Sequence, residues 1–94
     1  MVRLSNYVTD SNRNRTLLMR GLPFESQPED VEDFLAEFNV SPSNVILEQQ
    51  KGNRNTGLAI AFMSSPAEVR EAISKLNRKF IGSRYIEVSE FNLH

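Results

Sequence analysis

Arg20-Gly21-Leu22-Pro23-Phe24 closes a short apolar run over residues 16–19, and Thr56-Gly57-Leu58-Ala59-Ile60-Ala61-Phe62 forms a second run in which a glycine precedes the apolar residues. Short apolar runs bounded by glycine and proline are typical of strands that are largely buried on both faces. The two runs therefore predict two neighbouring strands of one small sheet.

The segments around these runs complete a β-α-β-β-α-β order. Ser26-Gln27-Pro28-Glu29 has the spacing of a capping box, and apolar residues then recur at helical spacing over residues 31–38. Residues 45–47 are rich in β-formers and lead into a polar hairpin turn at Gly52-Asn53. Ser65-Pro66-Ala67-Glu68 opens a second amphipathic helix, and residues 85–88 alternate as a last strand. This order predicts an α+β, ferredoxin-like sandwich, a four-stranded antiparallel sheet with two helices on one face.

Side-chain alternation assigns each strand residue to one face of the sheet. Toward the helices we expect Leu17, Met19, Val45, Leu47, Ala59, Ala61, Met63, Ile86 and Val88. On the outer face we expect an aliphatic patch of Leu18, Ile46, Leu58, Ile60 and Phe62, with Arg20, Glu48, Tyr85 and Glu87 beside it. Bare apolar area of this size is unusual on a monomer. Its cover is either the tail at residues 91–93, the leader with Leu4, Tyr7 and Val8, or a protein partner.

Length and composition indicate one small domain. The 94 residues are 39% hydrophobic, with only four glycines and four prolines. We expect a flexible leader over residues 1–15, the folded domain over residues 16–90 and a C-terminal tail over residues 91–94. No apolar stretch approaches the roughly 20 residues that cross a bilayer, so no membrane partner is predicted.

Residues with catalytic or metal-binding chemistry are scarce. The chain has no cysteine, its one histidine is the terminal His94, and its acids sit at helical spacing without a neighbouring base. We therefore predict no enzymatic activity, no catalytic residue, no metal, no cofactor and no small-molecule substrate.

The net charge of −1 conceals an uneven distribution. Half of the twelve acids lie between Glu25 and Glu37, where there is no basic residue. The rest of the chain then holds six acids against eleven Lys and Arg, a balance of +5. A phosphate-binding face is compatible with this balance if the acidic segment points away from it.

Leu17-Leu18-Met19-Arg20-Gly21-Leu22 resembles the hexamer of the RNA recognition motif (RRM), and residues 56–63 resemble its octamer. In the common form, aromatic rings at the second hexamer position and at the third and fifth octamer positions stack bases, and a basic residue at the first octamer position meets phosphate. This chain has Leu18, Leu58, Ile60 and Thr56 there. Each departure removes an RNA contact, since aliphatic groups cannot supply stacking worth about 1–3 kcal/mol per base.

A narrower resemblance fits the pattern better. Arg20 to Phe24, Thr56-Gly57 and Gly82-Ser83-Arg84-Tyr85-Ile86-Glu87-Val88 are similar to the quasi-RRM domains of the heterogeneous nuclear ribonucleoprotein F and H family, which also lack the sheet aromatics. The resemblance implies that loops at one sheet edge enclose guanines, and that Arg20, Phe24 and Tyr85 do so here. It also implies a basic residue between the second and third strands, a role open to Lys51 or Arg54.

Other cations extend this candidate site. Arg84 stands beside Tyr85, and Lys75, Arg78 and Lys79 precede the last strand, where they can attract the RNA backbone. Three structural alternatives stay open. Phe24 is either a base platform or a hydrophobic staple on the first helix, Tyr85 either stacks a base or packs against Leu18, and Arg54 is otherwise a solvated hairpin residue.

These observations predict a module that binds single-stranded, guanine-containing RNA through loops at the sheet edge. Its expected role is pre-mRNA processing or splicing regulation, with other RNA-processing proteins as further partners, in the nucleus or shuttling to the cytoplasm. The alternative is a protein-interaction module that has lost RNA binding and uses the aliphatic patch as its interface.

Overall fold

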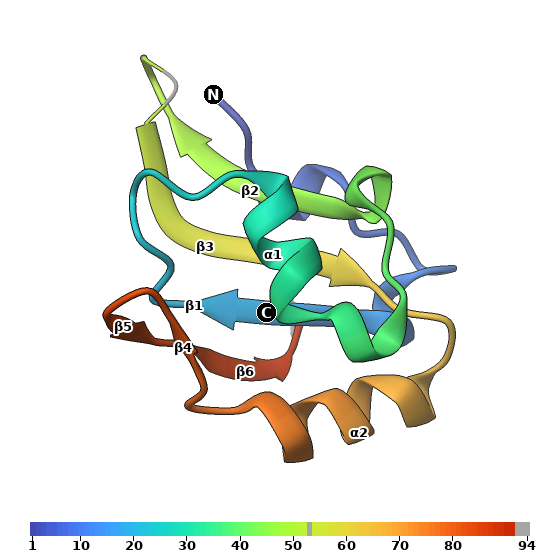
Figure 1. Ribbon diagram of the computed structural model, residues 1–94. Coiled ribbons are helices and arrows are strands. Elements are labelled where there is room, and N and C mark those ends of the chain that lie inside the picture. Colours follow the sequence, from blue (N-terminus) through green and yellow to red (C-terminus); the bar gives the residue numbers. More distant parts are fainter. Residues whose placement is uncertain (53, 92–94) are drawn as a thin grey trace.

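The computed structural model describes residues 1–52 and 54–91, so Asn53 of the expected turn and residues 92–94 of the expected tail lie outside it. Its main sheet contains β1 (Thr16–Arg20), β2 (Val45–Gln50), β3 (Arg54–Phe62) and β6 (Glu87–Glu90), antiparallel and in the order β2-β3-β1-β6. The helices α1 (Pro28–Phe34) and α2 (Pro66–Leu76) cover one face of this sheet (Figure 1). The predicted sandwich is confirmed. No helix within the described ranges is long and apolar enough to cross a membrane.

The core lies between the sheet and the two helices. All nine residues that alternation assigned to the inner face belong to one buried cluster, which Val31 and Leu35 complete from the α1 side and Val69, Ala72 and Leu76 from α2. Phe34 and Phe38 are partly buried at its margin. The agreement follows from the strict period of two in a strand, because a slip of one residue would turn every side chain to the wrong face.

The two helices begin differently. At α2 the Ser65 hydroxyl accepts a hydrogen bond from the Glu68 amide at 3.2 Å, as the capping-box spacing predicted. At α1 the expected box is one residue out of register, because Gln27 precedes the helix and its amide donates to Asp30 Oδ2 at 2.8 Å. Pro28 then opens the helix, where its missing N–H is not needed.

The expected last strand is split in two. Arg84 and Tyr85 form β5 (Arg84–Tyr85), which pairs with β4 (Phe80–Ile81) in a separate hairpin, and only Glu87 to Glu90 pair with β1. The cause is a pair of backbone bonds at the junction: the Arg78 amide donates to the Ile86 carbonyl at 2.7 Å, and the Ile86 amide to the Lys79 carbonyl at 2.8 Å. Tyr85 is therefore held by the hairpin and not by the main sheet.

The leader is folded, which corrects the expectation of a flexible segment over residues 1–15. It contains the 3₁₀ helices η1 (Leu4–Asn6) and η2 (Arg13–Arg15), and Val2 makes two backbone hydrogen bonds with Gln49 at the edge of β2. Leu4 and Val8 form a second buried cluster with Ile60 on the outer face of the sheet, opposite the helices. The leader is thus the cover that the aliphatic patch required.

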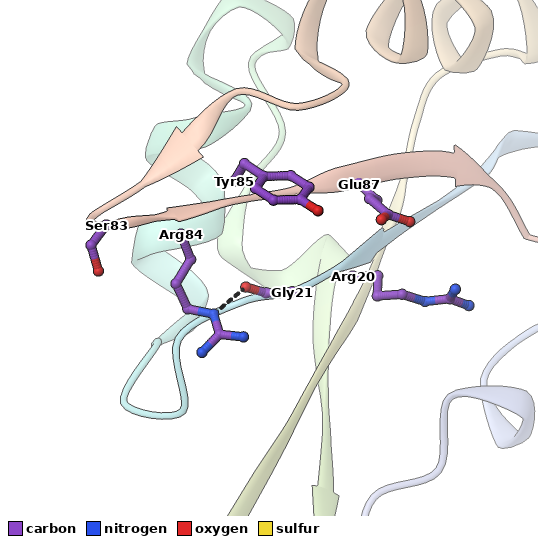
Figure 2. A pocket seen from close by; sticks show the side chains of 6 residues that line it. All are labelled: Arg20, Gly21, Ser83, Arg84, Tyr85 and Glu87. Carbon is purple, nitrogen blue, oxygen red and sulfur yellow. Dashed lines mark hydrogen bonds between the residues drawn. The ribbon is translucent and has the colours of Figure 1, made fainter.

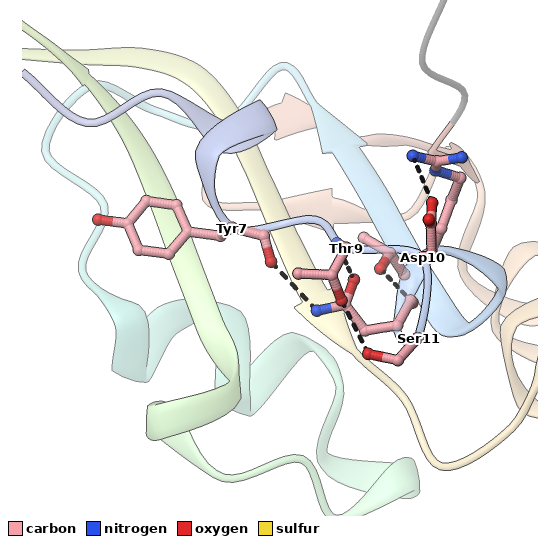
Figure 3. A network of polar contacts seen from close by, with 7 residues as sticks. Tyr7, Thr9, Asp10 and Ser11 are labelled. Atoms are coloured by element: carbon pink, nitrogen blue, oxygen red, sulfur yellow. Dashed lines mark hydrogen bonds and ion pairs between the residues drawn. The ribbon is translucent and has the colours of Figure 1, made fainter.

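Polar contacts hold the leader in a compact turn between Tyr7 and Thr16. Asn12 is its centre: its Oδ1 accepts from the Thr9 amide at 2.7 Å, its Nδ2 donates to the Tyr7 carbonyl at 3.1 Å, and its carbonyl accepts from Thr16 Oγ1 at 2.7 Å. Figure 3 shows this network folding back beside the start of β1. Such short-range bonds from Asn, Ser and Thr to nearby backbone give the segment its own turn structure.

Candidate nucleic-acid interface

The rim of the sheet is built on a contact between two glycines. The amides of Gly21 and Leu22 both donate to the Gly57 carbonyl, at 2.9 and 3.0 Å. Gly21 has φ of +99°, and a Cβ atom placed on it would lie 3.0 Å from the Tyr85 carbonyl oxygen. Only glycine combines this backbone conformation with so close an approach. The close approach of Gly21 to the Tyr85 carbonyl places the β4–β5 hairpin directly against the end of β1.

Gly21→Ala is expected to destabilise the domain by about 1–3 kcal/mol, because a side chain at this φ is strained and the new methyl group meets a backbone oxygen. Denaturant unfolding measures the change, and the amide shift of Tyr85 reports any displacement of the hairpin. Gly52→Ala is the matched control, since Gly52 has φ of +84° with no atom within 4 Å of its ideal Cβ. Equal losses in the two variants would show that the contact with Tyr85 is not tight.

Phe24 projects from the loop between β1 and α1 and is 65% exposed, so the staple alternative for it is wrong. Its backbone is held by Asn55 at the start of β3, whose Nδ2 donates to the carbonyls of Phe24 at 2.7 Å and Ser26 at 2.8 Å. The Arg84 guanidinium carbon lies 5.9 Å from the centre of the Phe24 ring, within the range of a cation–π contact. A ring from one loop and a cation from the hairpin therefore meet in space.

Arg84 and Tyr85 border a shallow pocket of about 320 Å³ with Arg20, Gly21, Ser83 and Glu87. In Figure 2, Arg84 reaches from β5 toward Gly21, and its Nε donates to the Gly21 carbonyl at 3.1 Å. The Tyr85 ring is 53% exposed and stands edge-on to Phe80, not against Leu18. Neither of the packing alternatives considered for Phe24 and Tyr85 therefore holds.

A second hollow of about 610 Å³ has Phe24 in its wall. It is lined by Phe24, Gln50, Arg54, Asn55 and Thr56, and so contains Arg54, one of the two candidates for the basic residue expected between the second and third strands. Sequence reasoning missed Gln50 and Asn55. Asn55 acts on Phe24 across 31 residues, and no local spacing signals such a contact. Gln50 lies in a polar stretch that was interpreted only as part of the turn.

The remaining predicted cations differ in their surroundings. Lys51, Arg78 and Lys79 are exposed and line neither hollow. Lys75 lies on α2, where its ammonium lies 2.6 Å from a Glu37 carboxylate oxygen and 3.0 Å from a Glu71 carboxylate oxygen. The hydrogen bonds that Lys75 donates to these two carboxylates raise its pKa above its ordinary value. Lys75 is thus engaged by acids, contrary to its expected role beside RNA. Within the described ranges no three acidic or histidine side chains gather to hold a metal ion.

The aliphatic patch is not open as an interface, which corrects the alternative prediction. Ile60 is 0% exposed beneath the leader, and Leu18, Ile46, Leu58 and Phe62 are partly buried around the same cluster. Phe91, the first residue of the tail that was one candidate for the cover, packs there as well. Glu48 fastens the cover, because its carboxylate accepts from the Leu4 amide at 3.4 Å and from Thr56 Oγ1 at 3.1 Å. At the positions where an RRM ordinarily stacks bases, the sheet therefore has the partly buried Leu18 and Leu58 and the fully covered Ile60 in place of aromatic rings.

The comparison with protein families agrees with this geometry. The profile described as an RRM domain matches residues 17–92. G-rich sequence factor 1 of Homo sapiens is 34% identical over 70 residues, which make up 74% of this chain and 14% of that protein. Heterogeneous nuclear ribonucleoprotein H of Homo sapiens is 30% identical over 79 residues, or 84% of this chain and 17% of that protein. The chain thus spans less than a fifth of the length of these relatives.

Solved structures give the same assignment. The crystal structure of G-rich RNA sequence binding factor 1 from Homo sapiens matches with a TM-score of 0.74 and 26% identity, over 83% of this chain and 80% of that one. The Glorund qRRM3 domain matches with a TM-score of 0.69 and 33% identity, over 80% of this chain and 90% of that one. The chain belongs to the RRM family and, as its rim residues and its relatives agree, to the quasi-RRM type within it.

Proposed function

We propose that this domain binds single-stranded RNA containing guanine through the rim formed by Arg20, Phe24, Arg84 and Tyr85. The observation that carries the proposal is that two well-exposed rings and an arginine lie together at the rim. Phe24 is on the loop after β1, Arg84 and Tyr85 are on β5, and the close approach of Gly21 to Tyr85 holds the two segments together. The sheet centre, where an RRM ordinarily stacks bases, is aliphatic and lies under the leader. Base stacking is thus supported at the rim.

The names of the relatives support RNA as the ligand class. One is called G-rich sequence factor 1 and another heterogeneous nuclear ribonucleoprotein H. The physical case is independent of these names. Exposed aromatic faces stack unpaired bases of any kind, and nearby guanidinium groups attract the phosphate backbone.

Guanine suits the pocket for a further reason. Its O6 and N7 accept hydrogen bonds, which Arg20 and Arg84 can donate, and its N1–H and N2 amino group need an acceptor. Glu87 lines the same pocket and lies opposite Arg20 in the register of β1 and β6, so a carboxylate acceptor and an arginine donor border one pocket. An arginine and a carboxylate in one pocket complement guanine better than adenine, which has no carbonyl acceptor.

Binding is tested by NMR titration of the whole chain with a guanine-tract RNA and a uridine-rich RNA. We expect shifts at the rim with the guanine tract, and Phe24→Leu or Tyr85→Leu to weaken binding by about 5- to 150-fold, since each removes a stacking surface worth about 1–3 kcal/mol. Arg84→Gln should also weaken binding. Lys75→Gln removes the same charge on the helix side and should leave the affinity unchanged.

Two results would count against the proposal. The absence of any chemical-shift change with either RNA would reject RNA binding altogether. Equal affinity for the two RNAs, with the same rim shifts, would retain RNA binding and reject the preference for guanine.

We also propose a role in pre-mRNA processing or splicing regulation, in the nucleus, within a longer protein. Support comes from the heterogeneous nuclear ribonucleoprotein relative, in which the matched region is a small part of the protein. One domain with a shallow site binds weakly, so linked domains would be needed for high avidity. Crosslinking in cells tests this role, and recovery of cytoplasmic mature mRNA alone would contradict it.

A further inference from the structure

We propose that Phe80 is an additional base-stacking residue, which extends the RNA site by one nucleotide beyond Tyr85 toward Arg78 and Lys79. The proposal rests on the proposed RNA-binding function and adds a subsite to it. Phe80 lies in no part of the sequence that indicated binding, and its role becomes visible only in the hairpin that the structure forms.

Phe80 and Tyr85 are directly opposite each other in the β4–β5 pair. Side chains of opposite residues in an antiparallel pair project from the same face, so the two rings stand side by side. Their centroids are 6.4 Å apart and their planes meet at 65°, an edge-to-face arrangement. Phe80 is 64% exposed. The pair is therefore a preformed aromatic surface open to solvent.

The hairpin does not need the Phe80 ring for its packing. Its other cross-strand pair is Ile81 with Arg84, in which Ile81 packs against the main core and Arg84 bonds to Gly21. Phe80 takes no part in either buried cluster. An exposed phenylalanine gains little from burial, whereas a second ring beside Tyr85 adds a stacking face for a planar group.

The charge next to Phe80 favours a nucleic acid over an apolar protein segment. Arg78 and Lys79 directly precede the ring, are both exposed, and form no ion pair with any described residue. The Arg78 amide donates to the Ile86 carbonyl and the Ile86 amide donates to the Lys79 carbonyl, so the backbone from which both cationic side chains extend is fixed beside the hairpin. A ring flanked by cations provides what a nucleotide requires, a stacking face for the base and positive charge for the phosphate.

The order of the groups along the rim predicts how the strand runs. Phe24 lies under Arg84, Tyr85 follows on β5, and Phe80 stands across the hairpin from Tyr85. A strand that stacks on Phe24 and Tyr85 therefore continues over Phe80. Because a ring stacks every base, this subsite should add affinity without adding a sequence preference.

The test measures affinity for a set of guanine-tract RNAs of roughly three to eight nucleotides, a length range suited to one small RNA-binding domain. For the wild-type chain, affinity should rise by about 5- to 150-fold at the length that reaches Phe80. In Phe80→Leu this step should vanish while the shortest RNA keeps its affinity. Phe80→Tyr should restore the step, because it returns a ring.

Two further readouts distinguish base stacking by Phe80 from a merely structural role. Contacts between Phe80 ring protons and RNA protons in NOE spectra are expected only for stacking. Lys79→Gln should lower the slope of log affinity against log salt by about one relative to Lys75→Gln, since it removes one phosphate contact. A Phe80→Leu chain that weakens all lengths equally would overturn the proposal, as would one that weakens none. A wild-type chain that binds no RNA would instead overturn the proposed function itself.

Discussion

Replacing both buried leader residues, Leu4→Ser with Val8→Ser, is expected to lower the free energy of unfolding by about 2–4 kcal/mol. Each side chain is almost completely buried, and such burial stabilises by about 1.5–3 kcal/mol. The leader regains chain entropy when it is released, which offsets part of the loss. Against a typical domain stability of about 5–15 kcal/mol, the change is large.

Denaturant unfolding of the whole chain gives the size of this effect. The matched control is Asn6→Ser with Tyr7→Ser, which alters two exposed neighbours in the same segment. It should change stability by no more than about 0.5 kcal/mol, as is usual for surface sites. If the two double variants were equally stable, the leader would not pack on the sheet as described.

The leader also shows where sequence reasoning ends. Its apolar residues Leu4 and Val8 stand four apart in a polar segment, too few to predict an element, and their burial depends on Ile60 in a strand more than fifty residues away. The requirement for a cover was nonetheless predictable, because period-two alternation placed five apolar side chains on the outer face. Side-chain alternation thus predicted that the outer face must be covered, but it did not choose among the tail, the leader and a protein partner.

The rim was predictable in part for the same kind of reason. Arg20, Phe24 and Tyr85 were identified through a resemblance carried by short contiguous motifs. Their assembly depends on contacts that such motifs do not record: the Gly57 carbonyl that receives two amides, the Asn55 amide that holds the Phe24 loop, and the break in the last strand at Ile86. Phe80 was not identified from the sequence, because it is the break in the last strand that allows Tyr85 to pair with Phe80 in the β4–β5 hairpin.

The second large effect is expected for Ile60→Asp. Ile60 pairs with Leu18 on one side and Ile46 on the other, lies beneath Leu4 and Val8, and is 0% exposed. A carboxylate there has no partner, and an unpaired buried charge costs about 3–5 kcal/mol. The charge can reach water only if the leader leaves the sheet, which exposes the apolar cluster instead. Either route should lower the free energy of unfolding by about 3–5 kcal/mol.

Hydrogen exchange distinguishes these two routes. If the leader leaves, the Val2 and Gln49 amides lose protection while those of Gly21 and Leu22 at the rim keep theirs, because only the first pair bonds to the leader. RNA binding at the rim should then survive in Ile60→Asp. Ser89→Asp adds the same charge at an exposed site on β6 and is the control. A loss in Ile60→Asp no larger than that control would mean that Ile60 is not covered.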